Sequence, residues 1–137
     1  MAINKTPLLT VDCVVIYNNS VLLIKRKNPP YKNFLALPGG FVDIGETVED
    51  ACVRELYEET SLKLKPSQIK LVGIYSKPGR DPRRNTIAIA YSVIIKKKIR
   101  VTAGDDAATA EFISDWKKKR LAFDHKTIIN DAFLNYK

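Results

Sequence analysis

Residues 37–62, LPGGFVDIGETVEDACVRELYEETSL, decide how this chain of 137 residues is organised. A glycine-rich turn leads directly into a stretch from Thr47 to Thr60 that contains no helix-breaking residue. Its alanine, leucine, arginine and glutamate residues favour a helix. Thr47 has the residue type of an N-cap, and Asp50 three residues later makes a capping-box-like pair with it. The segment therefore predicts a turn followed by a helix.

The acidic side chains of this helix fall on an unexpected face. At helical spacing, one broad arc collects the apolar residues that should pack on a core: Val48, Ala51, Cys52, Leu56 and Leu62. Glu55 and Glu59 lie inside that arc and Glu58 lies on its edge, whereas Arg54 lies on the opposite face. The helix is thus expected to bring carboxylates up to the core rather than to keep them in water.

Carboxylates in this pattern destabilise a helix unless something neutralises them. Acids spaced i, i+3 and i+4 repel one another, the C-terminal end of the helix macrodipole disfavours negative charge, and burial without a partner is costly. Divalent cations remove all these penalties, since Mg²⁺, Mn²⁺ and Ca²⁺ prefer clusters of oxygen ligands. A solvated acidic face is the alternative. The shared arc favours a metal site.

Length and composition fit an ordinary globular protein. The chain is long enough for one domain with a sizeable core, which we expect to span residues 1–137. It has no N-terminal pattern of a secretory signal and no apolar run long enough to cross a bilayer. We therefore expect a cytoplasmic protein that does not bind membranes. Cys13 and Cys52 lie in apolar surroundings without a CxxC or Cys/His pattern, which predicts buried thiols rather than a zinc site.

The formal net charge of +8 indicates an anionic partner. Much of it comes from two short basic runs, residues 96–100 and 117–120. A nucleic-acid surface is one interpretation, but no aromatic residues alternate with the basic ones as a single-strand platform requires. We favour solvated basic faces around a site for an anionic small molecule, and we expect no nucleic-acid partner.

The remaining segments predict a mixed α/β fold. Runs rich in β-branched and apolar residues predict strands at residues 8–17, 21–25, 34–37, 69–75 and 86–95, with a short strand at 111–113. Residues 77–85 and 103–108 are expected to be loops, residues 116–120 a helical turn, and residues 125–136 a closing amphipathic helix. Without a regular alternation of strands and helices, this order favours a mixed sheet with helices packed on it.

A fixed spacing of eight residues resembles the Nudix box, the signature of hydrolases that act on a nucleoside diphosphate linked to another moiety. The pattern G-x5-E-x7-R-E-U-x-E-E-x-x-U is matched by Gly40, Glu46, Arg54, Glu55, Leu56, Glu58, Glu59 and Leu62. Ser61 stands where this family usually has a glycine that ends the helix. The resemblance implies an α/β/α sandwich around a mixed sheet, with the turn and helix of residues 37–62 as the catalytic segment.

Flanking segments are similar to the ADP-ribose pyrophosphatase branch of this family. They are LLIKRKNPPYKNFLALPGG before the helix, Pro78 sixteen residues after Leu62, and GRDPR, AGDDA and LAFDH later in the chain. The resemblance implies hydrolysis of ADP-ribose to AMP and ribose 5-phosphate, and members of this kind are often homodimers. A nucleoside triphosphate pyrophosphohydrolase that clears oxidised nucleotides and a non-catalytic nucleotide-binding or sensor module are the alternatives.

The resemblance also assigns roles to residues. Glu55 and Glu59 would be the main ligands of Mg²⁺, or of Mn²⁺, with Glu58 sharing the cation and the Gly39 carbonyl completing the site. Arg54 would hold the acidic side chains in place, or form a surface ladder with residues four positions away. Glu46 would support the ligands or satisfy N–H groups at the helix start.

Substrate contacts and the catalytic base are less closely defined. Candidates for substrate contacts are Gly40, Arg26, Arg80, Arg83 and Phe123, with exposed arginines and a core phenylalanine as the alternative. Arg84-Asn85, Thr109 and Leu35 depart from the branch, and Thr109 stands where a loop glutamate is common. Asp105, Asp106 and Glu111 are the nearby candidates for the general base. His125 is expected to cap or pack the last helix, since nothing in the sequence places it near the acids.

Overall fold

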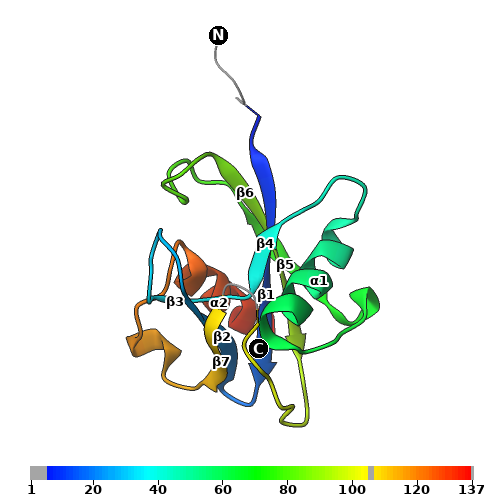
Figure 1. The fold of residues 1–137 in the computed structure, drawn as a ribbon. Helices are drawn as coiled ribbons and strands as arrows, with labels where there is room; N and C mark the ends of the chain where they lie inside the picture. The colour runs from blue at the N-terminus through cyan, green and yellow to red at the C-terminus, as the bar shows by residue number, and fades with distance from the viewer. Residues whose placement is uncertain (1–5, 105–106, 137) are drawn as a thin grey trace.

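The computed structural model describes residues 6–104 and 107–136 of the chain. Within these residues a sheet of seven strands forms the centre of the molecule (Figure 1). The strands are β1 (Leu8–Tyr17), β2 (Ser20–Arg26), β3 (Leu35–Ala36), β4 (Gly39–Phe41), β5 (Lys70–Tyr75), β6 (Thr86–Ile94) and β7 (Ala107–Ile113). Their order is β3-β2-β1-β6-β5, with β4 paired to β1 and β7 paired to β2. The sheet is mixed, because β1 and β6 run parallel whereas the other pairs are antiparallel.

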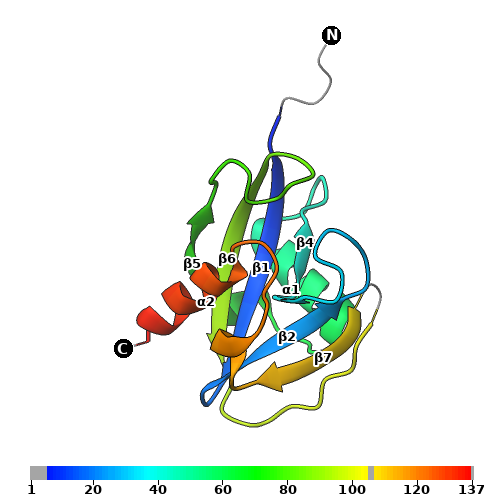
Figure 2. The same ribbon diagram turned by 90° about the vertical axis from the view of Figure 1, so that its left-hand side faces the viewer.

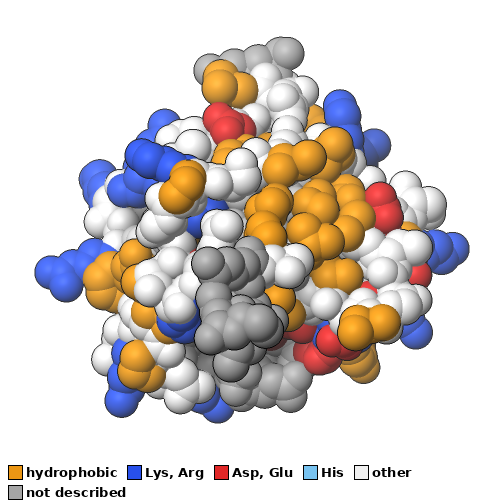
Figure 3. Space-filling view, turned by 90° about the horizontal axis from the view of Figure 1, so that it is seen from above, with side chains coloured by type: hydrophobic (Ala, Val, Ile, Leu, Met, Phe, Trp, Pro, Cys, Tyr) orange, Lys and Arg blue, Asp and Glu red, His pale blue; other side chains and the backbone are white. Residues whose placement is uncertain are grey.

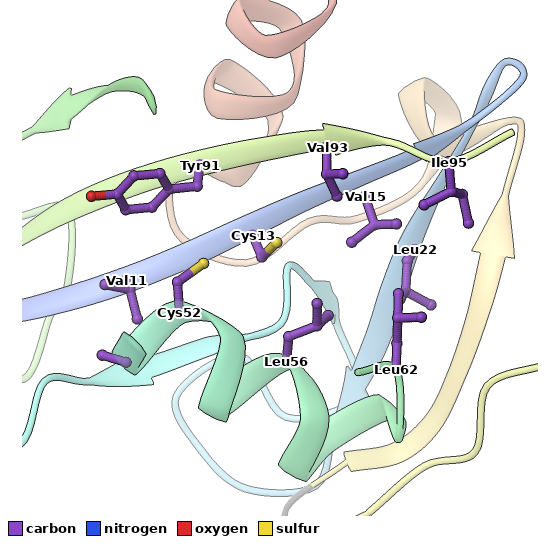
Figure 4. Close-up of a cluster of buried hydrophobic side chains, with 11 residues drawn as sticks. Val11, Cys13, Val15, Leu22, Cys52, Leu56, Leu62, Tyr91, Val93 and Ile95 are labelled. Atoms are coloured by element: carbon purple, nitrogen blue, oxygen red, sulfur yellow. The ribbon is translucent and has the colours of Figure 1, made fainter. Parts of the chain in front are cut away.

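Two helices cover opposite faces of this sheet (Figure 2). Helix α1 (Val48–Thr60) packs on the face to which Val11, Cys13 and Val15 of β1 point, with Ala51, Cys52 and Leu56 as its buried residues (Figure 4). Both cysteines are buried free thiols, as predicted. The neighbouring Cys13 thiol raises the pKa of Cys52, and burial raises it further, so this thiol is held in its unreactive form.

Helix α2 (His125–Leu134) packs on the other face. Successive side chains of a strand point to opposite faces, so Val14 and Ile16 of β1 meet Ile128 and Ile129 of α2 in a second core. Two 3₁₀ turns, η1 (Pro66–Gln68) and η2 (Trp116–Lys118), complete the elements. The α/β/α sandwich with a mixed sheet is therefore confirmed. Neither helix in the described part of the chain is long and apolar enough to cross a membrane.

One edge of β1 is shared by two partners. Its last residues pair with β2 through a hairpin turn, and its residues Thr10 to Asp12 pair with Phe41 to Gly39 of β4. The glycine segment, expected to be a turn, is thus a short strand. A Cβ atom at Gly39 would lie 2.1 Å from the carbonyl oxygen of Val11, so this pairing requires glycine there.

Most predicted elements agree with the structure to within two residues at their ends, and the region after β6 differs more. Ala107, predicted to be in a loop, begins β7. The short strand expected at 111–113 is the end of this longer strand. The reason is tertiary: β7 has the sequence AATAEFI, and it is held by antiparallel pairing with β2.

Candidate active site

Helix α1 is fixed at both ends. At its start the Thr47 hydroxyl accepts a hydrogen bond from Asp50 N at 3.0 Å, which is the predicted N-cap. At its end Ser61 adopts a left-handed conformation with φ of 65°. The segment before β7 then caps the helix, because Thr102 N donates to Thr60 O at 2.9 Å and Gly104 N donates to Glu59 O at 3.1 Å. The turn that carries Glu58 and Glu59 is thereby held rigidly.

Arg54 lies in the middle of the acidic cluster. Its guanidinium contacts Glu46 Oε1 at 2.7 Å, Glu55 Oε1 at 2.8 Å and Glu58 Oε1 at 2.7 Å. Arg54 was expected on the helix face opposite the acids. Its guanidinium group instead reaches the acids, so the expectation is wrong for this group. The side chain folds back because three carboxylates would otherwise face one another without a cation. It does hold acidic side chains, as the resemblance implied.

The remaining carboxylate, Glu59, is buried, and its Oε1 accepts a hydrogen bond from Gly39 N at 2.8 Å. A Cβ atom at Gly40 would lie 2.5 Å from the carboxyl group of Glu55. Glycines at 39 and 40 thus allow the backbone of β4 to approach two carboxylates of α1. Glu46 accepts from Asp43 N at 2.8 Å, so it also ties the connection between β4 and α1 to Arg54.

Burial and ion pairing move the pKa values of these groups apart. Burial raises the pKa of Glu55 above its ordinary value, despite the adjacent Arg54. The hydrogen bond from Arg54 lowers the pKa of Glu46. The hydrogen bond to Glu46 in turn raises the pKa of Arg54, so its positive charge is secure. The cluster therefore keeps one permanent cation among its acids.

The donor set fits a hard divalent cation in an open site. In the described part of the chain, no three His, Cys, Asp or Glu side chains are already grouped closely enough to hold a metal. One guanidinium nitrogen of Arg54 contacts both Glu55 and Glu58, and Glu59 is bonded to Gly39. A cation would take a carboxylate from Arg54. Mg²⁺ suits such a site, because it needs only one or two carboxylates beside water and phosphate oxygens.

The acidic cluster opens into a continuous cleft of two adjoining cavities. One cavity is lined by Glu55, Glu58 and Glu59 together with Arg26 and Arg83. The second shares Arg26, Gly39, Gly40, Glu59 and Arg83 with the first and adds Asp12, Arg80, Asp81, Phe123 and His125. Carboxylates and guanidinium groups thus line the same hollow.

Phe123 lies where the basic residues meet. Its ring is 5.1 Å from the guanidinium carbon of Arg26 and 5.9 Å from that of Arg83. Its backbone is left-handed with φ of 52°, which is uncommon for an aromatic residue. Asp81 pairs with Arg83 at 2.8 Å. The two arginines and the ring thus form one wall of the cleft.

Arg80 is not a free surface residue. Its side chain is 5% exposed and donates to both carboxylate oxygens of Asp124, at 2.9 and 2.7 Å, and to the Thr86 hydroxyl at 2.8 Å. The alternative of exposure is therefore wrong for Arg80. Burial would lower the pKa of Arg80, but hydrogen bonding to Asp124 raises it. This arginine joins the loop before β6 to the start of α2.

Comparison with known proteins agrees with this geometry. The family model described as NUDIX domain matches residues 6–131. The chain belongs to the Nudix family. It is 49% identical over 126 residues to an ADP-ribose pyrophosphatase of Methanocaldococcus jannaschii, covering 91% of this chain and 72% of that protein.

Solved Nudix structures share the fold of this Nudix chain. A MutT/nudix family protein from Enterococcus faecalis superposes with a TM-score of 0.88 at 34% identity, over 98% of this chain and 64% of the other. The Nudix domain of Shewanella oneidensis NrtR, solved in complex with ADP ribose, gives a TM-score of 0.89 at 26% identity, over 98% of this chain and 91% of the other. A bifunctional NMN adenylyltransferase/ADP ribose pyrophosphatase of Francisella tularensis, complexed with AMP and a Mn ion, gives 0.86 at 31% identity, over 99% of this chain and 44% of the other.

The Nudix box residues therefore lie together, whereas Glu111, one of the candidates for the base, lies apart from them. Asp105 and Asp106 fall outside the described residues. Glu111 is exposed on β7, and it shares the face of Leu23 and Ile113, which belong to the core on the α2 side. It does not line the cleft formed by the two cavities. Glu111 thus points away from α1, so it is not a candidate for the general base.

Two polar residues of the cleft, Asp12 and His125, were not predicted from the sequence to be part of the site. His125, which nothing in the sequence placed near the acids, lines the same cavity as Glu59, and its neighbour there is Asp12 of β1. Asp12 sits in a run of apolar residues, so a buried acid at that position was a signal available in the sequence. Nothing local to His125 shows its partner, because the two residues meet only through the packing of α2 on the sheet.

Proposed function

We propose that this Nudix chain hydrolyses ADP-ribose to AMP and ribose 5-phosphate with Mg²⁺, or with Mn²⁺ in its place. One observation carries the proposal: the three box glutamates and two arginines, Arg26 and Arg83, line one cleft. Acids that take a cation therefore face guanidinium groups that match phosphate geometry. The similarity to an ADP-ribose pyrophosphatase and to a Nudix domain solved with ADP ribose supports this substrate.

The reaction is attack of water on one phosphorus of the diphosphate. The new P–O bond forms as the bond to the bridging oxygen breaks, and the water gives up its protons. A bound divalent cation neutralises phosphate charge and lowers the pKa of water. Glu55, Glu58 and Glu59 would hold this cation, and Gly39 and Gly40 line the cleft in which the diphosphate would lie. Arg26 and Arg83 would offset the charge of the phosphates.

A carboxylate near the cleft would accept the proton of the attacking water. Asp105 and Asp106 remain our candidates, because Gly104 before them packs directly on the helix end. A Cβ atom at Gly104 would lie 2.4 Å from the carbonyl oxygen of Glu58. Single Asp105→Asn and Asp106→Asn variants would identify the base by a loss of kcat with little change in KM.

The first test is release of AMP from ADP-ribose, with and without Mg²⁺, beside Glu59→Gln. Glutamine keeps an oxygen that can accept from Gly39 N, but it lacks the charge that a cation needs, so the fold should survive while activity is lost. AMP formation by the wild type that disappears in the variant and in EDTA supports the proposal. Equal AMP formation by both proteins would overturn the assigned role of Glu59.

The same assay separates the two alternatives. Faster turnover of 8-oxo-dGTP than of ADP-ribose would favour the triphosphate pyrophosphohydrolase. Tight binding of ADP-ribose without turnover of either compound would favour a sensor module. An ADPR responsive transcriptional repressor of Acinetobacter baylyi is 32% identical over 93% of this chain, and the match covers 54% of that repressor.

Our proposal also includes a homodimer in the cytoplasm. Hydrophobic side chains gather on the end of the molecule seen in Figure 3. Leu9 and Phe41, on the paired strands β1 and β4, are 43% and 40% exposed. Exposed apolar patches mark interaction sites. Light scattering after size-exclusion chromatography tests the dimer, and a Phe41→Ser variant should weaken it if this patch is the interface.

A further inference from the structure

His125 makes two specific contacts with groups that the proposed chemistry does not involve directly. Its Nδ1 accepts a hydrogen bond from Leu37 N at 3.0 Å, and its Nε2 lies 3.3 Å from Asp12 Oδ1. Both residues are buried, at 4% and 6% exposure. Because Nδ1 accepts, the ring proton belongs on Nε2, where it faces the carboxylate. One imidazole thus joins the start of α2 to β1 and to Leu37, two residues before Gly39.

The backbone from Leu37 to Gly39 is held from three sides. Leu37 N donates to His125, Pro38 O accepts from Cys13 N at 2.9 Å, and Gly39 N donates to Glu59. Asp12 also lies directly against Gly39, since a Cβ atom there would be 2.6 Å from Asp12 Oδ1. Asp12 therefore touches both His125 and the residue that orients Glu59.

We propose that His125 and Asp12 are positioning residues for the box carboxylates. Together they hold the segment from Leu37 to Gly39 against β1, so that the Gly39 amide points at Glu59 and fixes the orientation of its carboxylate. This inference rests on the proposed function, because it assigns to Glu59 a part in the reaction. Neither His125 nor Asp12 takes part in the bond changes.

The two contacts of His125 can be separated by substitution. In His125→Asn the side-chain oxygen falls near the position of Nδ1, so it can accept from Leu37 N. In His125→Gln the amide nitrogen falls near the position of Nε2, so it can donate to Asp12. His125→Ala removes both contacts. Ile129 is a buried residue of α2 that does not line the cleft. Ile129→Val is therefore the control that lowers stability without changing the site.

Steady-state kinetics on ADP-ribose should show a loss confined to kcat. Supporting partners of metal ligands are worth about 10–100-fold in metal affinity or activity, and we expect a loss of kcat of this size for His125→Ala, with KM little changed. His125→Asn should recover more activity than His125→Gln, because the bond to Leu37 N lies closest to the glycine segment. Ile129→Val should lower Tm without lowering kcat. An unchanged kcat in His125→Ala, or equal values for the Asn and Gln variants, would overturn the proposal.

A second measurement does not depend on turnover. In metal-free ¹⁵N-labelled protein, exchange of the Gly39 amide hydrogen should accelerate in His125→Ala and Asp12→Asn, whereas amides in the middle of α1 should keep their protection. Mn²⁺ affinity, followed by its electron paramagnetic resonance signal, should weaken in the same variants. If the wild type turns over none of the substrates, the proposed function fails, and these two readouts still decide the positioning role. Unaltered Gly39 exchange and Mn²⁺ affinity would reject it.

Discussion

Ser61 adopts a backbone conformation that is unfavourable for serine. It is exposed, and its φ of 65° is left-handed, a conformation that is unfavourable for residues with a Cβ atom. Glycine adopts it without strain. Ser61→Gly should therefore raise the free energy of unfolding by about 1 kcal/mol, less the weak contact of its hydroxyl with Thr102 O at 3.3 Å.

Urea unfolding at fixed pH measures this change as a higher midpoint with an unchanged slope. Ser67→Gly is the matched control. Ser67 lies in η1 and is not among the left-handed residues, so glycine there should lower stability. A lower midpoint for Ser61→Gly would show that the Thr102 contact outweighs the backbone strain.

Gly40 leaves room for the carboxylate of Glu55. In Gly40→Ala the new methyl group would lie 2.5 Å from that carboxylate. The carboxylate is the flexible end of a side chain, so the protein should fold while Glu55 moves away from its place. We expect kcat on ADP-ribose to fall by about tenfold or more, in the range found for residues that support metal ligands. In Gly73→Ala the nearest atom would be 3.5 Å away, and activity should persist.

Arg54 determines the electrostatics of helix α1 as an element. Arg54→Met would leave Glu46, Glu55 and Glu58 without their shared cation. We expect the free energy of unfolding in EDTA to fall by about 1–3 kcal/mol. Added Mg²⁺ should restore more stability to this variant than to the wild type, because the cation replaces the missing charge.

Thermal unfolding in EDTA and in Mg²⁺ measures both effects. Arg100→Met, at an exposed position, should change neither value by more than a few tenths of a kcal/mol. Equal gains from Mg²⁺ in the wild type and in Arg54→Met would mean that the cation binds without displacing the arginine from its carboxylates.

The loop before β6 carries a second, independent ion pair. Burial alone would raise the pKa of Asp81, but the hydrogen bonds from Arg83 outweigh it and hold the pKa below the ordinary value of 3.8. A carboxyl group with a lowered pKa in the folded state stabilises the protein above its unfolded pKa, and this stabilisation disappears as pH falls through the lower, folded value. Asp81→Asn should thus cost about 1 kcal/mol near pH 7 and progressively less below pH of about 4.

Chemical unfolding of the wild type and Asp81→Asn at several pH values tests this directly. The difference between the two proteins should be constant above pH of about 5 and should shrink in more acidic solution. A difference that is independent of pH would show that Asp81 acts by shape and neutral hydrogen bonding rather than by its charge.

Local signals explain why some elements were predictable and others were not. Helix α1 could be placed to the residue because its cap, its composition and its apolar arc all lie within its own sequence. Strand β4 could not, since Gly39 and Gly40 look like a turn until β1 lies beside them. The acids of the site were found because they broke the expected pattern of α1. His125 and Arg80 were misjudged because their partners, Asp12 and Asp124, are distant in sequence.

At the scale of the whole molecule, the net charge of +8 should assist capture of an anionic substrate. The value of kcat/KM on ADP-ribose should fall several-fold as ionic strength rises from about 0.01 M to about 0.15 M, because the Debye length shrinks from about 30 Å to about 8 Å. The value of kcat at saturating substrate should change little. A Lys97→Gln/Lys98→Gln double variant, altered only in an exposed basic run, should show a shallower dependence on salt. An equal slope would locate the attraction in the cleft itself.

The parallel pairing of β1 with β6 also affects how the protein folds. Leu8 aligns with Thr86 and Ile16 with Ile94, so the centre of the sheet joins segments from opposite halves of the chain. Contacts between such distant segments slow folding, because a long loop must close before any of them forms. When synthesis has reached only the end of α1, every box glutamate has been made. Arg80, its partner Thr86 and His125 all come later in the chain. Catalytic competence should therefore appear late and abruptly during refolding, after most of the helical signal has returned.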